Sequence, residues 1–264
     1  MLLLNTKLNV PPVRPSHVRR AELIQKLHKL PDYKLALIVA SAGYGKTALV
    51  SEWIAQSSMR VVWFSIDVGD NDPVRFWDYV VAAIQSAYPD TGEQTLTLLH
   101  EPQPLPVETI LSTLINELSA LPDVLTLVLD DYHVIDSASI HEGLAFLVEH
   151  MPSQMRLVMT TRAVQAWADE GASLPESLAQ AGAVKTFGDL PLIVLTSRLN
   201  QQTGWQAMQA ELLQLSSNSQ QMIADNSGHN IEIDQPERGR SRSNCEDGLA
   251  ASISDSSRNY SDSH

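Results

Sequence analysis

Leu35-Ala-Leu-Ile-Val-Ala-Ser-Ala-Gly-Tyr-Gly-Lys-Thr-Ala-Leu49 is the segment from which the fold can be predicted. Its first six residues, 35–40, are mostly apolar, as expected for a short strand that is buried on both faces. Residues 41–45 contain two glycines and require a sharply turning backbone that leaves its N–H groups free. Apolar residues at helical spacing begin directly after Lys46 and Thr47, so we predict a helix there.

A strand, a glycine-containing loop, Lys-Thr and a helix together form the phosphate-binding P-loop. The groups that would hold phosphate oxygens are backbone amides of the loop and the first helical turn: Ala42, Gly43, Tyr44, Gly45, Lys46, Thr47 and Ala48. The Lys46 ammonium would reach the β- and γ-phosphates, and the Thr47 hydroxyl would ligate Mg²⁺. One position departs from the usual pattern, because Ala40 stands where the motif begins with glycine. We predict a nucleotide phosphate site at this loop.

The composition is that of an ordinary soluble globular protein, and we expect it to be cytoplasmic. The 264 residues are enough for one or two domains, with 44% hydrophobic and 19% charged residues. No apolar run reaches the roughly 18 residues of a membrane span, and the first residues do not form a signal peptide. The single cysteine, Cys245, excludes an internal disulfide. The net charge of −13 argues against sequence-independent binding of nucleic acid by the whole chain.

Residues 1–34 are basic, in contrast to the rest of the chain. Three prolines within residues 5–18 favour an extended arm, and the apolar spacing of residues 20–30 predicts a short helix. Two interpretations stay open for this arm. Its charges are solvated, or the arm folds beside an anionic nucleotide.

Further alternating strands and helices follow the P-loop. Residues 61–66 form a second predicted strand, and Asp72 with Pro73 is a helix-start signal, with the carboxylate as N-cap. A proline-containing loop over residues 89–106 leads to another predicted helix, whose apolar face spans residues 107–118.

The third predicted strand, residues 124–129, runs directly into Asp130 and Asp131. A sheet that ends in a carboxylate beside a phosphate loop can hold a metal-bound water, which predicts Asp130 as a Mg²⁺ ligand. Asp131 could orient or deprotonate the attacking water. The alternative is a strand that stops at a polar turn, but the spacing from the P-loop favours the metal site.

A fourth predicted strand, Met155–Thr161, ends at Arg162. Ligands of such sheets bind outside the carboxyl ends of the strands, so we predict that Arg162 senses the γ-phosphate; the alternative is a plain surface ion pair. Strands alternating with helices up to residue 162 predict an α/β fold with a P-loop NTPase-type parallel sheet flanked by helices.

Residues 1–163 resemble the N-terminal ATPase module of the large ATP-binding LuxR-type transcriptional regulators, the maltose-activator-like members of the STAND class of P-loop ATPases. The segments that carry the resemblance are Thr6-Lys-Leu8 with Pro11-Pro12, Val18-Arg-Arg-Ala-Glu-Leu23, Ala40–Thr47, Val62–Phe76, Leu127–His133 and Met159-Thr-Thr-Arg162. In that family alanine is usual at the first position of the phosphate loop, so Ala40 no longer counts against a nucleotide site.

The resemblance implies an ATP-driven switch, ADP-bound and closed at rest, ATP-bound and oligomeric once an inducer is sensed. The implied roles are base or ribose contact for Arg20, phosphate and Mg²⁺ binding for Lys46 and Thr47, Mg²⁺ ligation for Asp130, water activation for Asp131 and phosphate sensing for Arg162. The family continues with a winged-helix segment, sensor repeats and a helix-turn-helix, and none of these is visible in this sequence. We therefore expect nucleotide and possible self-association as partners, with no DNA-binding domain in this chain and no membrane.

Residues 164–238 resemble a different family, the C-terminal part of an α/β-hydrolase. Strands are expected within residues 188–196 and 221–225, and His229 occupies the place of the general base of a Ser-His-acid triad. That fold presents its nucleophile on a G-x-S-x-G turn, which does not occur here; the nearest run is Gly171-Ala-Ser-Leu-Pro175. An inert turn histidine is therefore the favoured interpretation of His229.

The predicted organisation is an arm and helix (1–34), an ATPase domain (35–163), a hydrolase-like segment (164–238) and a disordered polar tail (239–264). The favoured function is ATP binding, with slow hydrolysis, by a truncated regulator module. The alternatives are an esterase fragment that uses His229 and an inactive fusion product.

Overall fold

The computed structural model describes residues 2–13, 21–28, 33–40, 43–162, 192–197, 210, 213–214 and 216–224. Its strands are β1 (Leu35–Val39), β2 (Arg60–Ser65), β3 (Leu125–Asp130), β4 (Met155–Thr161), β5 (Leu192–Ser197) and β6 (Ser219–Ala224). Its α-helices are α1 (Ala21–Leu27), α2 (Lys46–Gln56), α3 (Pro73–Gln85), α4 (Glu93–Leu99), α5 (Val107–Ser119) and α6 (Ala138–Glu149). Short 3₁₀ turns are η1 (Asn5–Leu8), η3 (Val68–Asn71) and η4 (Tyr132–Val134).

The strands form a single parallel sheet in the order β2-β3-β4-β1-β5-β6. This confirms the predicted α/β fold with a parallel sheet between helices. The P-loop strand β1 is internal: Leu37 pairs with Met159 of β4 on one side and with Val194 of β5 on the other. The chain therefore reverses its direction of progress across the sheet at β1, and such switch points are where ligands of open α/β sheets bind.

The sheet extends beyond residue 163, where the sequence predicts the end of the ATPase domain. β5 and β6 lie in the segment assigned to a hydrolase-like unit, yet both are hydrogen-bonded into the sheet of β1. The physical reason is the composition of β1, whose five residues are all buried. Without β5, this apolar strand would be an edge with unpaired backbone groups. The hydrolase resemblance of residues 164–238 itself stays a prediction.

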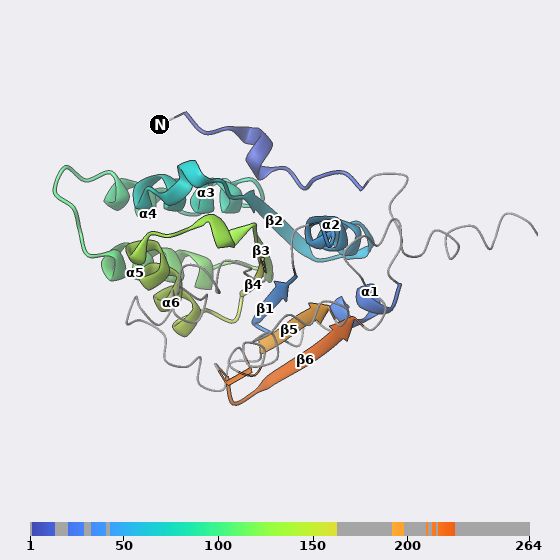
Figure 1. The fold of residues 1–264 in the computed structure, drawn as a ribbon. Coiled ribbons are helices and arrows are strands. Elements are labelled where there is room, and N and C mark those ends of the chain that lie inside the picture. The colour runs from blue at the N-terminus through green and yellow to red at the C-terminus, as the bar shows by residue number, and fades with distance from the viewer. Residues whose placement is uncertain are drawn as a thin grey trace, which may run out of the picture.

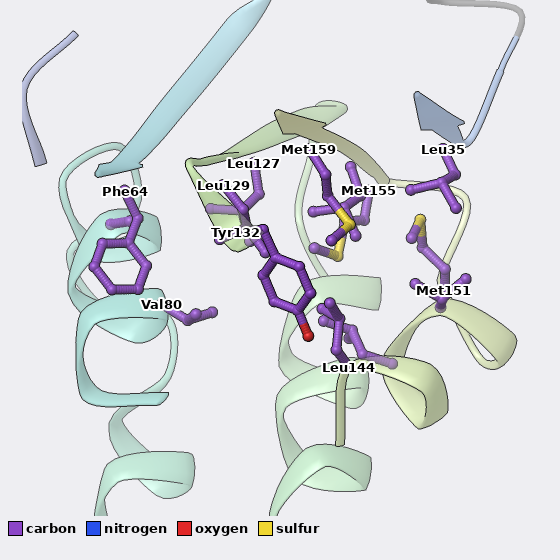
Figure 2. Packing of buried hydrophobic residues seen from close by; sticks show 14 of the residues in the cluster. Leu35, Phe64, Val80, Leu127, Leu129, Tyr132, Leu144, Met151, Met155 and Met159 are labelled. Carbon is purple, nitrogen blue, oxygen red and sulfur yellow. The ribbon is translucent and has the colours of Figure 1, made fainter. Parts of the chain in front are cut away.

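Two cores cover the two faces of the sheet, as the period-two alternation of the strands requires. Leu35, Leu37 and Val39 of β1 face the larger core, which contains residues of α3, α5 and α6. Ala36 and Ile38 face the smaller core with α1 and α2. Figure 1 shows α3 to α6 on one side of the sheet and α1 with α2 on the other, and Figure 2 shows the larger core from close by.

The sequence missed two elements. Helix α4 lies within residues 89–106, predicted as a loop; its start is held by Glu117, which accepts hydrogen bonds from the amides of Gly92 and Gln94 and from the Thr95 hydroxyl. A contact from a different helix stabilises it, so its own seven residues carry little periodic signal. The arm is also not fully extended, because η1 forms where Lys7 docks on the body of the protein.

Tyr132 and His141 form a buried polar pair at the larger core. The Tyr132 hydroxyl and His141 Nδ1 are 2.7 Å apart, and both side chains are almost fully buried. Burial is the main cause that lowers the pKa of His141, so its ring stays neutral to lower pH than a solvated histidine.

Among the helices that the structure describes, none is long and apolar enough to cross a membrane.

The buried imidazole makes stability depend on pH. Because the pKa of His141 is lower in the folded chain, the unfolded chain takes up the proton first. Its contribution to the free energy of unfolding is therefore complete above pH ~6.5 and is lost as the pH falls towards the folded pKa, by at most about 1.4 kcal/mol per pH unit. His141→Gln can still accept from Tyr132 but does not titrate. Urea unfolding between about pH 7.5 and pH 5.5 should show a steeper loss for the wild type than for this variant; parallel curves would contradict the assignment.

Candidate functional site

The predicted P-loop lies at the carboxyl end of β1, where the chain turns into α2. Gly43 and Gly45 have φ of 81° and 64°, a left-handed conformation that glycine adopts at little cost. Gly45 is the N-cap of α2 and makes no side-chain cap, so no side chain of the cap position competes for the first amides of the helix. An N-terminus of this kind, at the end of a buried central strand, is suited to bind phosphate oxygens.

Lys46 is the buried cation of the loop. Its side chain is only slightly exposed, with 7% of the residue accessible, and Nζ donates to the carbonyl of Ala40 at 3.0 Å. Burial lowers the pKa of Lys46, Arg162 lowers it further, and the carboxylates of Asp131 and Asp130 act in the opposite direction. An anionic phosphate would compensate this desolvated ammonium better than a neutral group would.

Asp130 ends β3 next to α2 and is 4% exposed. Thr47 Oγ1 lies 3.1 Å and 3.0 Å from its two carboxylate oxygens, and Thr160 Oγ1 of β4 donates to Oδ1 at 2.6 Å. Burial raises the pKa of Asp130, the two hydroxyls and Lys46 lower it, and Asp131 raises it.

The Thr47 and Asp130 oxygens fit the ligand shell of Mg²⁺. Mg²⁺ takes octahedral oxygen ligands at about 2.1 Å, so neighbouring ligands lie about 3 Å apart. The 3.0 Å separation of Thr47 Oγ1 and Asp130 Oδ2 matches that spacing. A hydroxyl and a carboxylate leave the remaining positions to water and phosphate, the usual arrangement for this ion.

Asp131 has a backbone conformation that is uncommon for residues other than glycine. Its φ of 61° and ψ of 39° are left-handed, and it is the only non-glycine with positive φ among the residues that the structure describes. The amide of Asp131 donates to Thr160 Oγ1 at 2.9 Å, which helps to hold this turn. The side chain is 39% exposed, so solvent water reaches its carboxylate.

The His133 ring lies close to the Asp131 side chain. Its Nδ1 is 3.7 Å from Asp131 Oδ1, too long for a hydrogen bond. Burial lowers the pKa of His133, as does the positive charge of Arg162 and of Lys46, while Asp131 raises it. The ring is therefore neutral, and a neutral ring at this distance does not form a strong ion pair with the Asp131 carboxylate.

The remaining predicted residues have different outcomes. Arg162 follows β4 directly, is exposed, and is close enough to influence the pKa of Lys46 and of His133. Tyr44 of the loop has its side chain buried, so only its backbone can face a ligand. Arg20, Ala42 and His229 lie outside the described residues, and their assignments stay predictions.

The structure adds one residue that the sequence analysis missed, Thr160. This fully buried hydroxyl donates to Asp130 and accepts from the amide of Asp131, so it joins the two acidic residues across the β3–β4 pair. The only signal in the sequence was a threonine pair at the end of an otherwise apolar strand. Such a pair is also compatible with a strand that simply leaves the core.

Comparison with known proteins supports the resemblance predicted from the motifs. The chain is 40% identical over 162 residues to the HTH-type transcriptional regulator MalT of Cronobacter sakazakii, 37% over 161 residues to that of Yersinia enterocolitica and 38% over 162 residues to that of Klebsiella pneumoniae. The similarity covers 61% of this chain and 18% of each regulator. The resemblance to the N-terminal part of such regulators is thus confirmed, and this chain spans under a fifth of their length.

The solved structures that match the chain are more distant in sequence. The Walker-type ATPase PABY2304 of Pyrococcus abyssi is 19% identical, with a TM-score of 0.40, over 57% of this chain and 47% of that chain. Cdc6p from Pyrobaculum aerophilum is 16% identical, with a TM-score of 0.42, over 68% of this chain and 48% of that chain. No protein-family model matches the chain.

The double role of Thr160 predicts a measurable effect on stability. Thr160→Val keeps the shape but removes the hydroxyl, which leaves the buried Asp130 oxygen and the Asp131 amide each short of one partner. We expect the free energy of unfolding to fall by about 1–3 kcal/mol. Thr160→Ser keeps the hydroxyl and should cost less than about 1 kcal/mol. Urea unfolding of the three proteins measures this, and equal stability of the valine and serine variants would refute the role.

Proposed function

We propose that this chain is an ATP-binding module that holds Mg²⁺-nucleotide at the carboxyl end of β1 and hydrolyses it slowly. The observation that carries the proposal is the meeting of four groups from two places in the fold: buried Lys46 and half-buried Thr47 at the start of α2, and Asp130 and Asp131 where β3 ends. The similarity to MalT regulators supports the same interpretation, since it covers 61% of this chain. Phosphate loops with an acidic strand end recur in nucleotide hydrolases.

Each group has a separate task in this proposal. The amides of the first turn of α2, with Gly43 and Gly45 shaping the loop, bind phosphate oxygens, and Lys46 neutralises the β- and γ-phosphates. Thr47 and Asp130 hold Mg²⁺, which supplies charge stabilisation for the transferred phosphoryl group. Arg162 approaches the γ-phosphate as the sensor, and Arg20 and Ala42 contact the nucleotide.

Asp131 is the residue proposed to act on water. Its carboxylate is solvent-accessible, next in sequence to the metal ligand and held outward by a left-handed turn. From there it can orient a water molecule for in-line attack and accept its proton. The desolvated neighbourhood of Lys46 and Asp130 keeps the phosphate contacts strong, because little bulk water screens them.

The biological role is proposed at the level of the relatives. They are named HTH-type transcriptional regulators, and this chain matches 18% of their length, so it would serve as the nucleotide-dependent part of regulation rather than as the DNA-reading part. ATP and ADP are the proposed ligands, and self-association through the ATPase domain is the proposed response to ATP.

Removal of the loop cation tests binding. Lys46→Ala should weaken the binding of fluorescent ATP about a hundredfold or more, because a buried charge-assisted contact to phosphate is lost. Arg60→Ala removes a cation at the start of β2, at the opposite edge of the sheet, and should leave the affinity unchanged. Equal affinity of the Lys46→Ala variant and the wild type would refute the nucleotide site.

Removal of the Asp131 charge tests hydrolysis separately from binding. Asp131→Asn keeps the shape and tolerates the left-handed backbone. We expect phosphate release to fall about a hundredfold or more, with ATP affinity within about threefold of the wild type. Single-turnover phosphate release with Mg²⁺ present is the measurement. A variant that hydrolyses ATP at the wild-type rate would remove Asp131 from the mechanism.

A further inference from the structure

The segment Asp67–Arg75 carries several polar residues that the proposed chemistry does not use. Asp67 caps η3 by accepting from the amide of Gly69 at 2.8 Å, and Asp70 accepts from the amide of Asp67 at 2.8 Å. Asp72 caps α3 by accepting from the amide of Arg75 at 2.8 Å. Local capping explains the three aspartates, but it explains only one contact of Asn71, whose Nδ2 donates to the Val68 carbonyl of η3 at 3.2 Å.

The Asn71 side chain binds the backbone of a loop more than sixty residues away. Its Nδ2 donates to the carbonyl of Val134 at 2.8 Å, and its Oδ1 accepts from the amides of Asp136 at 2.6 Å and Ser137 at 3.2 Å. One amide side chain thus meets three backbone groups of this loop. These three hydrogen bonds form the Asn71 bracket. The bracket fixes the path of the loop, because one planar amide group can donate to one backbone group and accept from two others only in a narrow range of geometries.

The bracketed loop begins at Asp131, the residue proposed to act on water. The amide of Val134 donates to the carbonyl of Asp131 at 3.2 Å, which closes the turn that begins at Asp131. Asn71 binds the carbonyl of the same Val134 and so holds the last residue of this turn. On its near side, the amide of Asp131 is held by Thr160. The left-handed conformation of Asp131 is unfavourable for a non-glycine and persists only where the surroundings impose it. Thr160 holds this turn directly at the Asp131 amide, and Asn71 holds it indirectly through the Val134 carbonyl.

A charge cluster around the buried Asp70 carboxylate fixes η3, the turn that carries Asn71. Lys7 Nζ lies 2.6 Å from Asp70 Oδ2 and 2.7 Å from Asp67 Oδ2, and Arg75 Nε lies 3.1 Å from Asp70 Oδ1. The Asp70 side chain has no exposed surface, and Lys7 also lies 4.9 Å from the centre of the Tyr79 ring. Asp70 and Asn71 are adjacent in sequence, so Lys7 fastens the N-terminal arm directly beside the bracket.

We propose that Asn71 is a positioning residue for Asp131, and that Lys7 supports it by anchoring η3 to the N-terminal arm. The inference rests on the proposed role of Asp131 in hydrolysis and adds a function for the arm. Docking of the arm at Asp70 then stabilises the water-activating turn at a distance, and release of the arm loosens that turn without touching the phosphate loop.

Hydrogen exchange in the full chain tests the bracket without nucleotide. In Asn71→Ala the amides of Asp136 and Ser137 lose their acceptor, so their exchange should accelerate about tenfold. Asn71→Asp keeps the acceptor oxygen but loses the donor to Val134, and should give a smaller change. Asn116→Ala, at an exposed position of α5, is the matched control and should not alter this loop. Unchanged exchange in Asn71→Ala would overturn the proposal.

The same variants separate positioning from binding. Asn71→Ala should slow single-turnover hydrolysis about ten- to a hundredfold, because Asp131 is misplaced, with ATP affinity within about threefold of the wild type. Asn71→Asp should recover part of the rate. A wild-type rate with accelerated exchange would overturn the role of Asn71 in positioning. If the wild type binds no nucleotide, the proposed function fails, whereas the exchange result still decides whether η3 and the loop are coupled.

A test of the role of the arm requires a variant that leaves no unpaired buried charge. Lys7→Met alone leaves Asp70 without a partner from the arm and can unfold the protein, so Lys7→Met is combined with Asp70→Asn. Exchange should then accelerate both in η3 and at residues 134–137, by less than in Asn71→Ala. Faster exchange in η3 with an unchanged loop at 134–137 would overturn the supporting role of Lys7.

Discussion

The parallel pairing of β1 with β4, and of β4 with β3, is the constraint on which the site depends. These ladders bring three strand ends together, so that the phosphate loop after β1, the acidic pair at the end of β3 and Thr160 of β4 meet at one edge. Because β1 is also paired with β5, it is an internal strand that two ladders hold in place. The position of the site is therefore set by the place of β1 in the sheet.

Burial and charge oppose each other within this edge. Lys46 and Asp130 are both nearly inaccessible, and burial shifts the pKa of each towards its neutral form. Their opposite charges and the hydroxyls of Thr47 and Thr160 counteract that effect. Such a balance favours ligands that carry the opposite charge to each buried side chain. These are an anionic phosphate for the lysine and a divalent cation for the carboxylate. The electrostatics and the fold therefore point to the same ligand.

The second acidic residue is controlled by groups outside the phosphate loop. Asp131 is held in a left-handed turn by Thr160 on one side and, through the Val134 carbonyl, by Asn71 on the other. The N-terminal arm reaches the same region through Lys7, which is buried against Asp70. The basic arm is thus neither simply solvated nor placed on the phosphate loop at this residue. It packs where β2 ends, and its contact there connects the arm to the segment that follows the acidic pair.

The sequence alone determined the P-loop, the order of the strands and of the helices other than α4 up to residue 162, and the acidic pair. Those features follow from local rules: apolar strands of five to seven residues, glycines at left-handed positions, and Asp72 with Pro73 at a helix start. It did not reveal α4, the role of Thr160 or the bracket formed by Asn71, since each depends on a partner more than twenty residues away. Only the tertiary structure decided that β5 and β6 complete the sheet of β1, because strand neighbours are chosen by burial of both faces and by pairing of edges, which no local pattern encodes.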